Sequence, residues 1–113
     1  MKNRITYSNI IAGTMTWGSW GKNLTKGEIT GLIDHCVENG ITTFDHADIY
    51  GGYDNEEAFG KAFFQSSTQR QDLQLITKCG IQYVCNARDN KVIHYDYSKE
   101  YNVWSAEQSL KKL

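Results

Sequence analysis

The sequence lacks the features that mark several classes of protein. It contains no proline, and no apolar run is long enough to cross a bilayer or to form the core of a signal peptide, since the run nearest the N-terminus is only Ile10–Ala12. Its 12 basic and 13 acidic residues leave a net charge of -1, which gives no electrostatic footprint for nucleic acid or an anionic membrane. We therefore expect a cytoplasmic protein that binds neither.

The cysteines and glycines also lack the spacings of well-known binding motifs. Three cysteines without a CxxC spacing predict neither a disulfide framework nor a zinc site, and we expect no metal. No GxGxxG motif follows a strand pattern, which argues against a Rossmann enzyme. The 113 residues suffice for one small domain.

Strand and helix patterns alternate along most of the chain. Stretches rich in β-branched residues predict buried strands at residues 9–14, 41–45 and 73–78. Helical patterns separate them, so the expected order is βαβαβ. Short links and the right-handed crossover rule then predict a parallel sheet.

Each expected helix begins with a capping signal. Thr25 precedes the first helix, with Glu28 in the capping-box position, and Asp54 opens a similar D-x-x-E signal for the second. Ser98 can cap a third helix. Its apolar stripe is expected to comprise Val103, Ala106, Leu110 and Leu113. The stripe ends without a capping glycine or a following strand, so we expect a truncated chain.

The stretch 41–52, ITTFDHADIYGG, carries most of the possible chemistry. Asp45 ends a strand, Tyr50 follows on a short loop, and Lys78 ends the next strand. Adjacent parallel strands lie roughly 4.8 Å apart, so Asp45 and Lys78 can form a partly buried ion pair. An ammonium near a phenol stabilises the phenolate, which makes the phenol a better proton donor for carbonyl reduction. A purely structural ion pair is the alternative.

The same residues carry a resemblance. The pattern GITTFDHADIYGGYDNEEAFGKAF, followed by LITKCGI, resembles the aldo-keto reductase superfamily. The family's F-D-x-A-x-x-Y-G is present at residues 44–51, its lysine is present as Lys78, and the closing SAEQSLKKL resembles the helix before its fourth strand. The match covers nearly the whole chain and is most similar to the bacterial YdhF-like branch.

The resemblance implies both a fold and a reaction. The fold is the first three βα units of a TIM (β/α)8 barrel, with residues 1–113 as one partial domain truncated before strand 4. The reaction is reduction of a small aldehyde or ketone by NADPH, or by NADH, with Tyr50 as proton donor tuned by Asp45 and Lys78. The implied cofactor-binding residues are Gly13, Thr14, Met15 and Asp45, and the residues implied near the substrate are Trp17 and Trp20. The two tryptophans lie in a glycine-rich loop, and covering the end of the core is an alternative role for them.

Parts of the family pattern are absent. The family's fourth catalytic residue is a histidine at the end of the fourth strand, and neither His46 nor His94 matches it. The segments that bind the adenosine phosphate are also missing, and a full barrel needs about 250 residues. We therefore expect the isolated chain to lack useful activity, to bind NADPH poorly and to self-associate through exposed sheet edges.

Two other functions remain open at this point. A cofactor-binding regulatory subunit on the same barrel, as among potassium-channel β subunits, also keeps the aspartate, tyrosine and lysine. A metal-dependent barrel hydrolase would use Asp45, His46 and Asp48, but three such close positions on one strand end can hardly converge on one ion. Asp48, Tyr53 and Asp54 can instead anchor the loop through polar contacts, and the sequence does not decide this.

Overall fold

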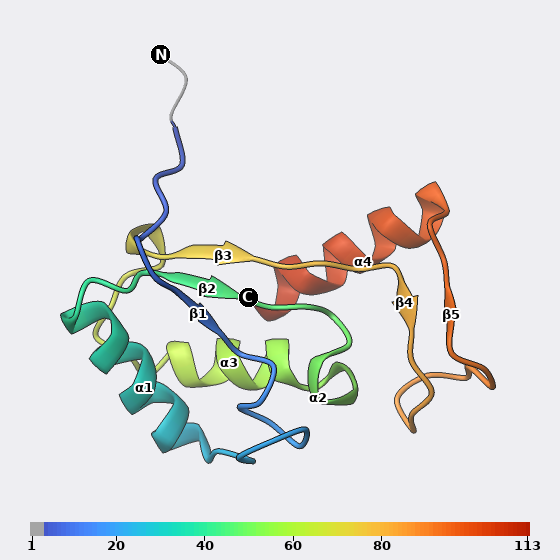
Figure 1. The fold of residues 1–113 in the computed structure, drawn as a ribbon, viewed down its shortest axis with the longest axis horizontal. Coiled ribbons are helices and arrows are strands. Elements are labelled where there is room, and N and C mark those ends of the chain that lie inside the picture. Colours follow the sequence, from blue (N-terminus) through green and yellow to red (C-terminus); the bar gives the residue numbers. More distant parts are fainter. Residues whose placement is uncertain (1–3) are drawn as a thin grey trace.

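A three-stranded parallel sheet with the order β1-β2-β3 forms the centre of the fold (Figure 1). The computed structural model describes residues 4–113. The strands are β1 (Ile11–Gly13), β2 (Thr43–Asp45) and β3 (Gln74–Ile76). Gly13 pairs with Asp45, and Asp45 pairs with Ile76, so the carboxyl ends of all three strands lie on one rim. The expected strand order and parallel pairing are confirmed, although each strand is shorter than predicted.

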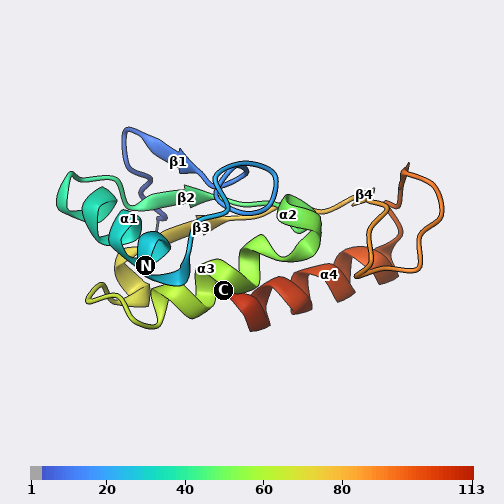
Figure 2. The same ribbon diagram turned by 90° about the horizontal axis from the view of Figure 1, so that it is seen from below.

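Helices cover one face of this sheet. They are α1 (Lys26–Glu38), α2 (Tyr50–Tyr53), α3 (Asn55–Phe63) and α4 (Lys99–Lys112), with a 3-10 turn, η1, at Arg70–Asp72. Figure 1 shows α1 and α3 below the strands, and Figure 2 shows α4 alongside α3. No helix within residues 4–113 covers the opposite face (Figure 2). None of the helices in this range is long and apolar enough to cross a membrane.

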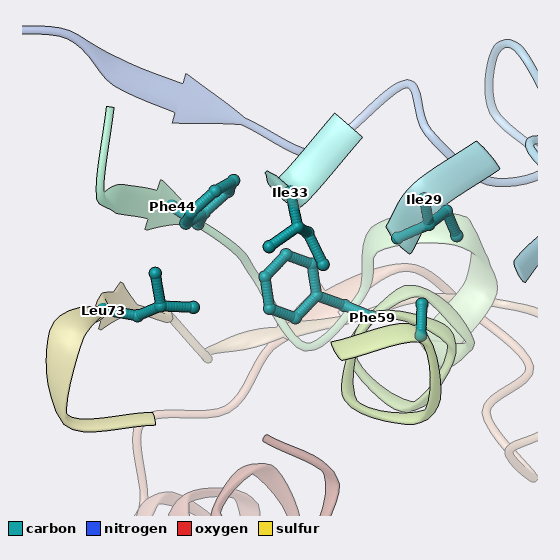
Figure 3. Close-up of a cluster of buried hydrophobic side chains, with 6 residues drawn as sticks. Ile29, Ile33, Phe44, Phe59 and Leu73 are labelled. Atoms are coloured by element: carbon teal, nitrogen blue, oxygen red, sulfur yellow. The ribbon is translucent and has the colours of Figure 1, made fainter. Parts of the chain in front are cut away.

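The hydrophobic core lies between the sheet and the helices α1 and α3. Its buried residues are Ile29, Ile33, Phe44, Phe59, Ala62 and Leu73 (Figure 3). Ala12, Phe44 and Leu75 occupy paired positions on the three strands and face this core. Side chains alternate along a strand, so Asp45 points to the face that the helices leave open.

The predicted cap of α1 by Thr25 is present, but the prediction that Asp54 caps α3 is wrong. The Thr25 hydroxyl accepts the Glu28 N–H at 3.2 Å, and the Glu28 carboxylate accepts the Thr25 N–H at 3.1 Å. Gly40 follows α1 with a φ of +77°, as a helix-ending glycine does. Asp54 has a helical backbone because α2 runs directly into α3, and its side chain makes no capping hydrogen bond. A capping side chain needs an extended backbone, which the preceding turn does not allow here.

The predicted buried face of α4 is also wrong. Val103, Ala106 and Leu110 are exposed, and Leu110 keeps 81% of its surface accessible. Only Leu113 of the expected stripe packs against the core. The buried residues of α4 are Tyr101, Ser105 and Ser109, which follow one another at four-residue steps. They face buried carboxylates, so hydrogen bonding rather than apolar contact decides which face of α4 is buried.

The irregular stretch between β3 and α4 contains a small antiparallel ribbon. Its strands are β4 (Ile81–Gln82) and β5 (His94–Tyr95), which pair with each other and not with the parallel sheet. The sequence predicts an extended loop here, and the ribbon is the one regular feature within it. It stands beyond the strand ends, on the side where α2 lies (Figure 1).

Candidate active site

Asp45 and Lys78 form an ion pair at the carboxyl end of the sheet. The Lys78 Nζ lies 2.7 Å from Asp45 Oδ1 and 2.8 Å from Oδ2, and it also donates to the His46 carbonyl at 2.6 Å. Asp45 ends β2, and Lys78 lies two residues beyond β3, so two neighbouring strands deliver the pair. The Lys78 and Asp45 side chains are 49% and 33% exposed. Solvent screens a pair of this kind, so its main effect is to orient the amine rather than to stabilise the fold.

Tyr50 lies beside the same amine. The Lys78 Nζ is 5.4 Å from the centre of the Tyr50 ring. The Trp20 ring packs edge-to-face against the Tyr50 ring, with 6.2 Å between the two ring centres. Tyr50 opens the short α2 turn, in which Gly51 and Gly52 both have a φ of +64°. Residues with a Cβ rarely adopt this backbone conformation, so the two glycines permit the turn that holds Tyr50 at the rim.

A cavity of about 340 Å³ opens next to these groups. Tyr50, Lys78, Tyr95 and Tyr97 are among the residues that line it. The rings of the last two stack with their centres 5.6 Å apart. The ribbon and the residues that follow it therefore contribute an aromatic wall, Tyr95 and Tyr97, to the cavity that the phenol and the amine also line.

The two tryptophans predicted near the substrate occupy different places. Trp20 contacts Tyr50, and its ring centre is also 5.1 Å from that of Tyr83. Trp17 instead packs against the core, with its ring centre 6.2 Å from those of both Phe44 and Phe59. Trp20 therefore lies beside Tyr50 at the rim, whereas Trp17 covers the end of the core, which is the alternative role considered for the tryptophans. Their contact with a substrate stays a prediction.

The residues predicted to hold a cofactor flank β1 at the same rim. Gly13 and Met15 are exposed, and nothing lies within 4 Å of the place a Gly13 Cβ would take. The Thr14 side chain is buried, and its hydroxyl donates to the Asp45 carbonyl at 3.0 Å. The surface beside Gly13 is therefore open, and the partly exposed Asp45 lies next to it on β2.

His46 is a buried residue whose role the sequence does not indicate. The Thr14 hydroxyl lies 2.9 Å from His46 Nδ1. Because the hydroxyl donates its single proton to the Asp45 carbonyl, it accepts a hydrogen bond from Nδ1. This pairing assigns a proton to Nδ1, and the buried Nε2 has no hydrogen-bond partner. Burial lowers the pKa of His46 to about 4, the Asp45 carboxylate opposes this shift, and the Lys78 ammonium reinforces it.

No metal centre accompanies this histidine in the described part of the chain. Residues 4–113 contain no cluster of three or more side chains able to bind a metal ion. Asp45 is paired with Lys78, and Asp48 is buried against α4. Both carboxylates that the hydrolase alternative would use are thus engaged by other side chains.

Asp48 and Tyr53 are polar anchors, as the sequence allows. Asp48 Oδ2 accepts the hydroxyl protons of Tyr101 and Ser105, both at 3.0 Å. The Tyr53 hydroxyl donates to the Ile81 carbonyl at 3.3 Å and accepts the backbone N–H of residue 83 at 2.8 Å. The four-residue spacing of hydroxyls in α4 is the sequence signal that points to such a buried polar face.

Glu56 is a second buried carboxylate that faces α4. It accepts the Ser109 hydroxyl at 3.0 Å and the Thr77 hydroxyl at 2.8 Å. Thr77 directly precedes Lys78, so this contact supports the end of β3 from the helix side. In the sequence Glu56 follows the expected start of a helix, and nothing there signals this contact.

Comparison with known proteins assigns a family to this arrangement. The model of the aldo/keto reductase family matches residues 9–113. The oxidoreductase YcsN of Bacillus subtilis, described as uncharacterized, is 42% identical over 110 residues, which are 96% of this chain and 36% of that protein. The oxidoreductase YdhF of Escherichia coli is 37% identical over 105 residues, or 92% of this chain and 34% of that protein.

Solved structures agree with these relatives. An aldo-keto reductase of Bacillus halodurans in its holo form superimposes with a TM-score of 0.74 at 29% identity, and the match covers 95% of this chain and 32% of that one. The chain thus spans about a third of the length of the relatives it matches. Its three βα units correspond to part of the family's TIM barrel. The chain belongs to the aldo/keto reductase family.

Proposed function

We propose that this chain supplies the proton-donating centre of an NADPH-dependent reduction of aldehydes or ketones to alcohols, with NADH as a possible substitute. Tyr50 is the proton donor in this proposal, and Lys78 and Asp45 support it. The observation that carries the proposal is the position of the Lys78 amine, 2.7 Å from the Asp45 carboxylate and 5.4 Å from the centre of the Tyr50 ring.

Each of the three side chains has a separate task. A reduced nicotinamide, when bound at this rim, would provide the hydride for the carbonyl carbon. The Tyr50 hydroxyl gives its proton to the carbonyl oxygen, and the phenolate that remains takes a proton from solvent. The Lys78 ammonium stabilises this phenolate, since an opposite charge nearby favours the charged form. Asp45 and the His46 carbonyl hold the lysine amine in place.

The rim offers room for both reactants. Gly13, Met15 and Asp45 would hold the nicotinamide end of the cofactor, because they are accessible around the open space above β1. The carbonyl compound would lie in the neighbouring cavity, which Tyr50 and Lys78 line. The aromatic wall of this cavity favours substrates with an apolar or aromatic group beside the carbonyl.

The experiment is a graft into a longer relative. This chain replaces the matching segment of YcsN, its 42% identical relative from Bacillus subtilis. The assay follows oxidation of NADPH with 4-nitrobenzaldehyde as substrate. Removal of a general acid slows catalysis by about 10²–10⁴-fold, so the graft with Tyr50→Phe should lose activity by that factor. The control is Tyr7→Phe, which makes the same change at an exposed tyrosine.

Two outcomes would contradict the proposal. A Tyr50→Phe graft as active as the unmodified graft would remove Tyr50 as the proton donor. A graft that binds NADPH, as followed by cofactor fluorescence, but turns over no aldehyde or ketone would favour a cofactor-binding regulatory subunit instead. Replacing Lys78 by Met and Asp45 by Asn in separate grafts tests the two supporting roles.

A further inference from the structure

The carboxylate of Asp48 lies at the junction of three segments. Asp48 is 5% exposed and belongs to the loop between Asp45 and Tyr50. Its Oδ2 accepts hydroxyl protons from Tyr101 and Ser105 of α4, both at 3.0 Å. Its own backbone N–H donates to the Lys78 carbonyl at 3.0 Å. One residue therefore joins α4 to the loop that carries the phenol and to the backbone that carries the amine.

A second contact links α4 to the same turn. The Arg88 guanidinium lies 3.8 Å from the centre of the Tyr53 ring and 4.6 Å from the centre of the Trp104 ring. Tyr53 ends α2, three residues after Tyr50, and Trp104 belongs to α4. A cation between two aromatic rings holds them together, so α4 is attached to both ends of the segment that contains Tyr50.

Stability alone does not account for a polar contact here. Burying a carboxylate and two hydroxyls carries a desolvation cost, which the hydrogen bonds between them offset only when their geometry is good. The apolar residues Val103 and Leu110 of the same helix are exposed, so α4 does not use them to dock onto Asp48 and its loop. Directional hydrogen bonds fix the place of a loop more narrowly than apolar packing does.

We propose that Asp48 is a positioning residue: held by Tyr101 and Ser105, it sets the place of the Tyr50 loop relative to Lys78. Its effect on catalysis rests on the proposed function, but its effect on the loop does not. Displacing a reacting group by a small distance can slow a reaction about 10²-fold. Loss of the Asp48 contacts should therefore lower kcat and leave KM nearly unchanged.

The first test uses the 113-residue chain and needs no turnover. NMR measures hydrogen exchange at the backbone N–H of residue 48 and the ring resonances of Tyr50, in Ser105→Ala and Tyr101→Phe variants. We expect exchange at least tenfold faster and shifted Tyr50 resonances in both. The matched control is Ser66→Ala, which removes another serine hydroxyl bonded to a carboxylate, that of Asp34, beyond the far end of α3. Equal effects of Ser105→Ala and Ser66→Ala would overturn the proposal.

The second test uses the YcsN graft and separates kcat from KM. Asp48→Ala should lower kcat at least tenfold. Asp48→Asn should restore most of it, because both hydroxyls bond to a single oxygen that an amide also provides. Unchanged kcat in a folded Asp48→Ala graft would overturn the proposal, as would an Asn variant no better than Ala. If no graft turns over any substrate, the proposed function fails, and the NMR result on the chain still decides the role of Asp48.

Discussion

The Thr14 hydroxyl and the His46 imidazole lie 2.9 Å apart at a place that solvent does not reach. They belong to the ends of neighbouring strands, and the same hydroxyl also bonds to the Asp45 carbonyl. In this contact Nδ1 donates its proton to the hydroxyl, and Nε2 stays buried without a hydrogen-bond partner. Protonating that nitrogen would create a buried charge without a partner, which has a measurable consequence for folding.

The chain should lose stability as the pH falls from about 6.5 to about 4 because of His46. The pKa of this group is lowered to about 4 in the folded chain, whereas its ordinary value is 6.5. The unfolded chain therefore binds the proton first, so stability is complete above pH 6.5 and falls towards pH 4. The loss approaches about 3 kcal/mol for this size of shift. Denaturant unfolding at a series of pH values measures it.

A pair of histidine variants isolates this effect from the titrating carboxylates. His46→Gln should flatten the curve between pH 6.5 and 4, because no imidazole is left to bind a proton. His35→Gln should leave the curve as steep as in the unmodified chain, since His35 is exposed on α1. A His46→Gln chain with the original slope would show that the buried imidazole does not control acid sensitivity.

Gly51→Ala should destabilise the chain more than Gly40→Ala. Both glycines have positive φ, +64° and +77°, so each alanine costs about 1–2 kcal/mol in backbone strain. A Cβ at Gly51 would also meet Asn55 Oδ1 at 2.2 Å, whereas nothing lies within 4 Å at Gly40. Asn55 is held by its bond to the Thr14 carbonyl at 2.9 Å, so it cannot move away freely.

Thermal or denaturant unfolding of the two alanine variants gives the difference directly. We expect the free energy of unfolding of Gly51→Ala to be lower than that of Gly40→Ala by about 1–3 kcal/mol, which is the usual cost of overpacking. Equal stabilities would mean that the Asn55 side chain relocates without cost.

The chain should self-associate through its sheet edges at high concentration. Strands β1 and β3 each pair with β2 alone among the described residues, so both have an unpaired side. Ile11 on β1 is 47% exposed, and Ile11→Lys places a charge at that edge. Sedimentation velocity should show a smaller weight-average mass for this variant than for the unmodified chain. An unmodified chain that stays monomeric at every concentration measured would contradict this expectation.

The isolated 113-residue polypeptide should show no measurable turnover of 4-nitrobenzaldehyde with NADPH. It spans about a third of the length of its relatives, and a complete barrel of this type has about 250 residues. Only part of the wall around a cofactor is therefore available within residues 4–113. The assay is NADPH oxidation by the purified chain, with heat-denatured chain as the blank, and a rate above the blank would refute the expectation.

The sequence by itself determined the order of the parallel strands and the meeting of Asp45, Tyr50 and Lys78. The reason is local: consecutive βα units place the carboxyl ends of their strands on one rim, so residues at those ends meet wherever the pattern is read correctly. The cap of α1 was equally predictable, because Thr25 and Glu28 are only three residues apart and act on each other.

The tertiary structure alone decided which side chains surround that rim. Trp17 packs into the core and His46 is buried, because helices α1 and α3 cover the side of the sheet on which Phe44 and Phe59 meet. The buried face of α4 was not predictable from apolar periodicity, which assumes an apolar neighbour. Its neighbours are the carboxylates of Asp48 and Glu56, more than 50 residues away along the chain, and only folding brings them to face the helix.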